Sequence, residues 1–379
     1  MHIIRVCPSY YPHFYLGGSV VADYEIDKAL VAEGHTVTVL TCKGETNDIA
    51  KEALSEKHKV IRYRSIGNSK YGISLGQGLA IIREYWNKRD DVKIVWFGGV
   101  WNLWALIGPI LCRILTLKYV MTTHGMLIPS LIDMKSSFLK KIVIKIFLKK
   151  HLEKAHKVHF TVKDELQKTL LATKAKMQSV IFPLCFDLSR FDCRSTSFKA
   201  EKTNKVTISF IGRITQKKRV DLIIKALEMI SPKIKKNVRF NVFGPDEASL
   251  WDTTRYTKSK VGVEINYKGP VYGKELVHAY HETDIFILCS ESENFAISVV
   301  EAAFCYCVPL LTKEVGVSEY FSNTSAAFSK LDAFDISRNI EDLVCNETKR
   351  EELSNNARLV SEQFSTKSLE PSYFKKLIG

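Results

Sequence analysis

Residues 284–312 read DIFILCSESENFAISVVEAAFCYCVPLLT, and this stretch indicates the architecture of the chain. Residues 285–289 form a short apolar run of β-formers that ends in a Ser/Glu/Asn cluster, which is typical of a buried parallel strand. A helical pattern follows over 296–304, and residues 308–312 again have the pattern of a strand, with Pro309 near its start. The whole predicts a βαβ unit, and ligands of such sheets bind at the carboxyl ends of the strands.

The loop and helix of this unit have the composition of an anion site. The first amides of the helix would lack intrahelical acceptors, and the helix dipole adds positive potential where they point. We expect a phosphate there, with Glu293 and Glu301 accepting hydrogen bonds from sugar hydroxyls. A capping carboxylate at Glu293 and a solvated or salt-bridged Glu301 would explain the same residues. The other ligand-binding candidates of this stretch are Asn294, Phe295, Ala296 and Ile297.

With these residues in place, the sequence resembles the retaining glycosyltransferases of family four. That family has the GT-B fold, an α/β architecture of two Rossmann-like domains that face each other across a cleft. Its donor-sugar site contains a Glu, seven residues and a second Glu, the spacing of Glu293 and Glu301 here. Asp284 and the strand containing Pro309 also match, and the resemblance covers nearly the whole chain.

Length and resemblance together predict two domains. A chain of 379 residues is long for a single core, so two units of under about 200 residues each are expected. We expect an acceptor-binding domain at 1–190 and a nucleotide-sugar-binding domain at 200–362, joined by a polar linker. The resemblance implies that a helix at 363–379 crosses back to the first domain.

Composition narrows the environment and the partners. The net charge of +14 indicates an anionic partner, such as nucleic acid, anionic lipid or a phosphorylated substrate. Nine dispersed cysteines favour buried thiols in a reducing cytoplasm over a disulfide scaffold. The uncharged segment 94–112 could just cross a bilayer, but its glycines, Asn102 and Pro109 favour a strand, a turn and a buried helix. The N-terminus has the pattern of a first strand, not of a signal peptide.

Two features of the first domain are candidates for the ligand site. The pair Gly17 and Gly18 opens a helix, where a backbone without a Cβ can approach a ligand, although a plain turn explains it equally well. His124 follows a strand and precedes Gly125, a place that suits a cleft. An isolated histidine there is more often a satisfied core residue, but the resemblance implies a contact of His124 with the transferring sugar.

The most basic stretch, residues 138–154, predicts an amphipathic helix. Lys141, Lys145 and Lys149 form a stripe at i, i+4 spacing between two apolar flanks. Lysines between apolar flanks suit a helix on an anionic membrane leaflet, and a half-buried helix with one solvated face fits as well. No nucleic-acid-binding signature accompanies the charge.

The second domain opens with a strand at 206–211 and a glycine-containing, cationic loop before a helix, which together make an anion site. The resemblance implies that Arg213 and Lys218 form the diphosphate clamp of the donor. Arg219 stands where the family usually has glycine. Asn294 and Ala296 also replace common glycines, and Cys305-Tyr-Cys307 replaces a small residue and a glycine, which bears on the identity of the donor more than on the reaction class.

The residues and the resemblance together predict a retaining hexosyltransferase. It would move a sugar from a nucleotide diphosphate sugar, expected to be UDP-linked, to an acceptor hydroxyl without a metal or other cofactor. The basic helix points to a lipid-linked saccharide at the inner face of the cytoplasmic membrane, in polysaccharide or lipopolysaccharide assembly. The alternatives are a basic membrane-surface or nucleic-acid-binding protein without catalysis, and a GT-B nucleotide-sugar epimerase.

Overall fold

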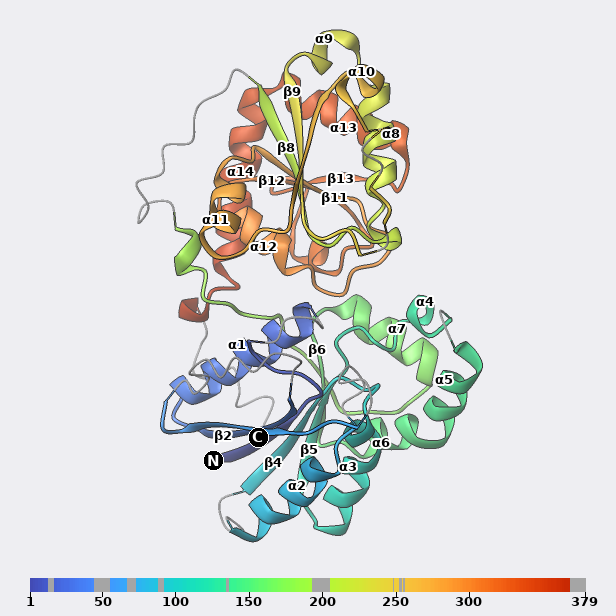
Figure 1. The fold of residues 1–379 in the computed structure, drawn as a ribbon, viewed down its shortest axis with the longest axis vertical. Helices are drawn as coiled ribbons and strands as arrows, with labels where there is room; N and C mark the ends of the chain where they lie inside the picture. Colours follow the sequence, from blue (N-terminus) through green and yellow to red (C-terminus); the bar gives the residue numbers. More distant parts are fainter. Residues whose placement is uncertain are drawn as a thin grey trace. The chain divides into compact units, whose positions relative to one another are not determined.

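The chain forms two compact units (Figure 1). They are Met1–Cys185 and Phe186–Ser368. The computed structural model describes residues 1–12, 17–43, 55–66, 73–87, 92–133, 136–192, 205–247, 249–251, 254 and 256–368. The predicted helix at 363–379 lies mostly outside the described residues, which end with a short 3₁₀ turn at Thr366–Ser368.

The first unit is built on a parallel sheet of seven strands in the order β3-β2-β1-β4-β5-β6-β7. Its central strands are buried along nearly their whole described length because helices cover both faces, which is why they have nearly continuous apolar sequences. The strands are β1 His2–Val6, β2 Thr36–Cys42, β3 His58–Tyr63, β4 Val92–Gly98, β5 Lys118–Thr122, β6 Lys157–Phe160 and β7 Ser179–Ile181.

The helices of the first unit follow the crossovers between its strands. One face of the sheet packs on a core to which α2, α3 and the 144–154 segment contribute. The helices are α1 Gly18–Ala32, α2 Leu75–Asn87, α3 Leu103–Ile114, α4 Pro129–Asp133, α5 Ser137–Val143, a π-helix Ile144–Leu148, α6 Lys149–Lys154 and α7 Lys163–Thr173, with a 3₁₀ turn at Ser189–Phe191 just inside the second unit.

The second unit is built on a parallel sheet of six strands in the order β10-β9-β8-β11-β12-β13. The order reverses between β8 and β11, which places a topological switch point, the usual ligand-binding position of such sheets, at their carboxyl ends. The strands are β8 Val206–Ile211, β9 Val238–Phe243, β10 Glu264–Gly269, β11 Ile285–Leu288, β12 Val308–Thr312 and β13 Ala327–Ser329.

Helices cover both faces of this second sheet (Figure 1). α8 and α13 pack together on one face, and α12 and α14 on the other. The helices are α8 Val220–Met229, α9 Pro232–Lys235, α10 Lys258–Val261, α11 Gly273–His281, α12 Ile297–Phe304, α13 Ala333–Cys345 and α14 Glu347–Glu362, with 3₁₀ turns at Gln216–Lys218 and Gly316–Tyr320. Both units therefore have the Rossmann-like form expected from the sequence.

The uncharged segment 94–112 forms the end of β4, a glycine turn and most of α3. Asn102 caps α3 by accepting a hydrogen bond from the Ala105 amide at 2.8 Å. Among the residues that the structure describes, no helix is long and apolar enough to cross a membrane.

Candidate active site

Three charged side chains meet at the carboxyl end of the second sheet. The carboxylate of Glu293 lies 3.1 Å from the Lys217 ammonium and 3.2 Å from that of Lys218. Glu293 follows β11 and the lysines follow β8, so the switch point of the sheet brings the two loops together. Burial alone would raise the pKa of Glu293, but the two lysines hold it below its ordinary value. The sequence pattern singles out Glu293 and Lys218, whereas the contact of Lys217 with Glu293 is seen only in the structure.

Lys218 is the more buried of the two lysines. Burial lowers its pKa below the ordinary lysine value, although Glu293 works in the opposite direction. A partly desolvated ammonium beside one carboxylate is poised to bind a further anion. The Lys217 side chain is 38% exposed and adds a second, more accessible charge.

The loop that carries these lysines is packed tightly against the end of β9. A Cβ added to Gly244, at a φ of +136°, would lie 1.9 Å from the carbonyl oxygen of Gly212. Only a glycine at 244 allows this approach. Gly244 is therefore needed for residues 212–219, the clamp loop, to reach their position.

Arg219 occupies a left-handed backbone conformation, with a φ of +48°. Glycine adopts this conformation without strain, which accounts physically for the glycine that related sequences were expected to have there. The Arg219 side chain is held by ion pairs to Asp221 at 3.1 Å and to Glu291 at 2.8 Å. Its charge is therefore already compensated by one carboxylate on α8 and one in the loop after β11. Ala296, another position expected to hold glycine, has a φ of +65°.

The loop before α12 is anchored through its backbone. The Glu293 amide donates to the carbonyl of Glu314, and the Gly316 amide donates to the carbonyl of Glu293. Phe295 is buried, with its ring against Phe186 and Phe364. These contacts fix the start of α12, whose first amides are oriented for an anion.

Glu301 lies one turn or more along α12 from these amides and has partners of its own. It accepts hydrogen bonds from Arg190 at 3.1 Å and from the Tyr280 hydroxyl at 2.8 Å. Burial raises its pKa above the ordinary glutamate value, against the effect of Arg190. A ribose hydroxyl at Glu301 would have to share the carboxylate with these two groups. Arg190 carries no signal in the sequence.

Arg213, the other predicted clamp residue, is half-exposed. Its guanidinium lies 3.3 Å from the carboxylate of Glu247, which is equally exposed. Such a pair is weak and easily exchanged for another anion. Arg213 is close enough to Lys218 to contribute to lowering its pKa.

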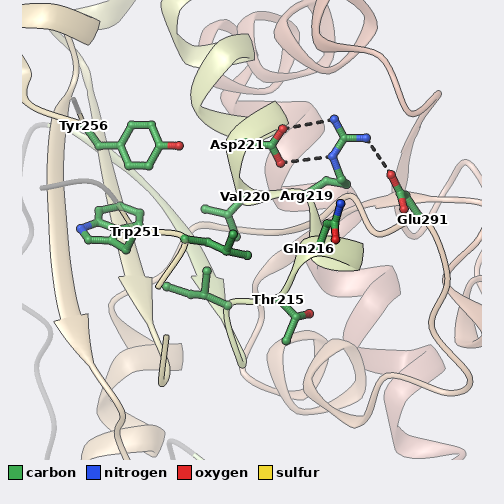
Figure 2. Close-up of a pocket in the computed structure, with 10 residues that line it drawn as sticks. Thr215, Gln216, Arg219, Val220, Asp221, Trp251, Tyr256 and Glu291 are labelled. Carbon is green, nitrogen blue, oxygen red and sulfur yellow. Dashed lines mark hydrogen bonds and ion pairs between the residues drawn. The ribbon is translucent and has the colours of Figure 1, made fainter. Parts of the chain in front are cut away.

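A cavity of about 500 Å³ borders the same clamp loop (Figure 2). Trp251 and Tyr256 form one side of it, and the ion-paired Arg219 lies on the other. Trp251 is stacked on Tyr267 with ring centroids 5.1 Å apart. The cavity therefore has an aromatic and aliphatic side and a polar, charged side, and it lies next to the predicted phosphate site.

The candidates of the first unit lie at the amino end of α1 and the carboxyl end of β5. Gly17, with a φ of +75°, precedes α1, and Gly18 is its first residue. His124 follows β5 in a left-handed conformation, and its Nε2 lies 3.2 Å from a carboxylate oxygen of Asp23. Asp23 is buried and cannot be singled out from the sequence, because nothing in the local pattern distinguishes it from a solvated helical acid.

Residues 194–360 match the family model described as glycosyl transferases group 1. The matched region contains Arg213, Lys218, Glu293 and Glu301. Among curated proteins, a subunit of the phosphatidylinositol N-acetylglucosaminyltransferase of Arabidopsis thaliana is 22% identical over 343 residues, which cover 90% of this chain and 74% of that protein.

Solved structures have the same fold over the whole chain. HepE of Anabaena, crystallised in complex with UDP, has a TM-score of 0.76 at 14% identity and covers 100% of this chain and 99% of its own. WaaG, described as a glycosyltransferase involved in lipopolysaccharide biosynthesis, has a TM-score of 0.70 at 15% identity and covers 99% of each chain. The chain therefore has the GT-B fold.

Proposed function

Through residues 194–360 this chain belongs to the group 1 glycosyl transferases and is a sugar-transferring enzyme, and we propose that it transfers its sugar from a uridine diphosphate donor, with retention, to a lipid-linked saccharide. The observation that carries the proposal is the contact of Glu293 with Lys217 and Lys218 beside the start of α12. Two ammonium groups, free helix amides and an ordered carboxylate provide for both halves of such a donor, its diphosphate and its sugar.

In the proposed reaction the hard step is the departure of the diphosphate from a carbon that becomes oxocarbenium-like. Lys217, Lys218 and Arg213 would stabilise the charge that develops on the leaving group, together with the first amides of α12. Glu293 would release one lysine to the diphosphate and orient the sugar hydroxyls. Glu301, with Arg190 beside it, would bind the ribose.

The retained configuration would follow from attack on the same face that the diphosphate leaves. The acceptor hydroxyl would form the new bond to the anomeric carbon while the bond to the diphosphate breaks. The departing phosphate oxygen would take the proton of the acceptor. In the first unit, Gly17 and Gly18 would approach the donor phosphates, and His124 would contact the transferring sugar.

A uridine donor is favoured by analogy with a solved structure. HepE, which has the same fold, is crystallised with UDP and also with UDP-glucose. The clamp would act without a metal ion because its cations are lysine and arginine side chains. Full activity after treatment with a chelator would support this, whereas activity restored only by a divalent ion would contradict it.

A membrane-bound acceptor is supported by the helical segment 137–154. Its inner flank, Ile144, Leu148 and Leu152, is buried in the core of the first unit. Its outer flank is exposed: Phe138 is 76% exposed and Ile146 58%. Further exposed side chains of the segment are Leu139, Ile142 and Phe147, beside Lys141, Lys145 and Lys150.

Such a surface suits a membrane leaflet better than a nucleic acid. Aliphatic and aromatic side chains between lysines would enter the boundary between headgroups and acyl chains, while the lysines pair with anionic headgroups. We therefore propose a peripheral enzyme at the inner face of the cytoplasmic membrane, acting in polysaccharide or lipopolysaccharide assembly.

The donor proposal is tested by calorimetric titration with UDP, GDP and ADP. We expect UDP to bind most tightly and binding to be lost in the double variant Arg213→Ala/Lys218→Ala. Lys225→Ala is the matched control, because it removes an exposed cation from α8 in the same unit. Failure of all three nucleotides to bind, or equal binding by the double variant, would overturn the proposal. With a donor in hand, the anomeric configuration of the product tests retention.

A further inference from the structure

A buried chain of charges in the first unit ends at His124. Arg5, on β1, is fully buried and donates to Asp23 at 3.1 Å and to Asp27 at 2.5 Å. Asp23 in turn lies 3.2 Å from Nε2 of His124. A guanidinium and two carboxylates are costly to bury unless they pair with one another, so their mutual contacts hold this arrangement in place.

The backbone of His124 is fixed independently of this chain. Glu165, on α7, accepts hydrogen bonds from the Thr123 hydroxyl and the Gly125 amide, both at 2.5 Å. These bonds flank His124 on both sides and hold its left-handed turn, with a φ of +48°. The His124 side chain is only 5% exposed, so the ring can present a single edge to a ligand.

The chemistry of Asp23 decides which edge that is. Burial by itself would raise the pKa of Asp23, but His124 and Arg5 outweigh it and hold the pKa below its ordinary value. An ionised carboxylate can only accept hydrogen bonds, so the imidazole nitrogen that faces it must carry a hydrogen whatever the charge of the ring. Nδ1 is then the nitrogen left for another partner.

Gly98, at the end of β4, leaves open the space that the Asp23 carboxylate occupies. A Cβ added to Gly98 would lie 2.3 Å from Oδ2 of Asp23. The close contact means that any larger residue at 98 would displace the carboxylate from His124. β1, β4, β5 and α1 thus converge on one side-chain contact.

From these contacts we infer that Asp23 is a positioning residue that holds His124 with its protonated Nε2 turned inward and Nδ1 turned toward the hydroxyls of the transferring sugar. Arg5 holds Asp23 in place through their ion pair. The inference rests on the proposed function for the sugar contact of His124, but the orientation and protonation of the ring can be measured without any substrate.

The first measurement is nuclear magnetic resonance of protein whose histidines are labelled with nitrogen-15. The His124 signals are assigned by their absence in His124→Gln. We expect Nε2 of His124 to carry the hydrogen in the wild type. In Asp23→Asn we expect this preference for a hydrogen on Nε2 to be lost. Asp27→Asn is the matched control, because Asp27 also pairs with Arg5 but makes no hydrogen bond or ion pair with His124 among the described residues. It should leave the His124 signals unchanged.

Gly98→Ala supplies a second variant that keeps every ionisable group. It should disturb the His124 signals as Asp23→Asn does, and thermal melting checks that both variants are folded. A bare Nε2 in the wild type, or unchanged signals in both folded variants, would overturn the inference.

Calorimetry with UDP and UDP-glucose then links the orientation to the sugar. Asp23→Asn should weaken UDP-glucose by about 10- to 100-fold, the loss expected from a misplaced contact, and leave UDP unchanged. Equal weakening of both would contradict a role at the sugar. Normal His124 signals together with no binding of UDP to the wild type would instead contradict the proposed function and leave the positioning intact.

Discussion

The carboxylate of Glu293 lies 3.2 Å from the ammonium group of Lys218, and the two residues come from loops that follow different strands of the second sheet. Each partner has its pKa lowered, although burial alone would move the pKa of Glu293 upward. A donor diphosphate would compete with Glu293 for the same ammonium. This contact is therefore where charge, pH and ligand binding are coupled.

Affinity for UDP should fall at alkaline pH. The pKa of Lys218 lies below the ordinary lysine value of 10.5, so its ammonium loses its proton earlier than an exposed lysine as the pH rises. Above that pKa, affinity that depends on the ammonium falls by about tenfold per pH unit. Lys218→Arg, which stays charged, should show a flatter profile over the alkaline range below the ordinary lysine value. Calorimetric titrations measure both, and identical profiles would contradict the role of Lys218.

Gly244→Ala should destabilise the second unit and abolish binding of UDP. The added Cβ would lie 1.9 Å from the Gly212 carbonyl oxygen, so the clamp loop would have to move, at a cost above about 2 kcal/mol. Gly269→Ala is the control: its φ of +71° is also positive, but no atom lies within 4 Å of the added Cβ. It should cost about 1 kcal/mol and retain binding. Urea unfolding separates strain from steric overlap, and equal effects would contradict the close-approach argument.

His159 should make the first unit sensitive to acid. Burial lowers its pKa to about 4, and its ring is held by Thr122 at 3.2 Å and by the Phe182 carbonyl at 2.9 Å. The unfolded state takes up the proton at the ordinary value of 6.5, so stability falls as the pH drops from there toward 4, by up to about 3 kcal/mol. His159→Gln should show a shallower fall in melting temperature over this range. A parallel fall in both proteins would show that other groups account for it.

Ile146→Glu should weaken attachment to vesicles that contain anionic lipid. Ile146 is 58% exposed among lysines on the π-helical turn, and burying an aliphatic side chain in the membrane boundary contributes about 1.5–3 kcal/mol. A loss of tenfold or more in vesicle sedimentation is expected. Leu171→Glu, at a 73% exposed position on α7 outside the basic segment, makes the same change in charge and should bind normally. Equal losses in both variants would show that the charge alone matters.

Much of the second unit can be predicted because its signals are local. Apolar runs and a helical period predict the β11–α12–β12 unit, and its helix begins at Ile297, one residue after the expected start. Glycines mark tight backbone in many chains, yet here Arg219, Ala296 and Tyr306 have positive φ angles without being glycine. The left-handed turns at Arg219 and Ala296 are therefore identifiable by resemblance to related sequences but not from these residues themselves.

The linear order of residues was enough to predict the alternation of strands and helices and the loops in which Arg213, Lys218, Glu293 and His124 lie. Backbone hydrogen bonding and side-chain periodicity act over a few residues, so they can be recognised along the chain. The partners of these residues emerged only in the folded protein. Lys217 meets Glu293, Arg190 meets Glu301, and Asp23 meets His124 because folding gathers segments that are distant in sequence around each sheet. Which charges meet depends on strand order and burial, and neither is a local property.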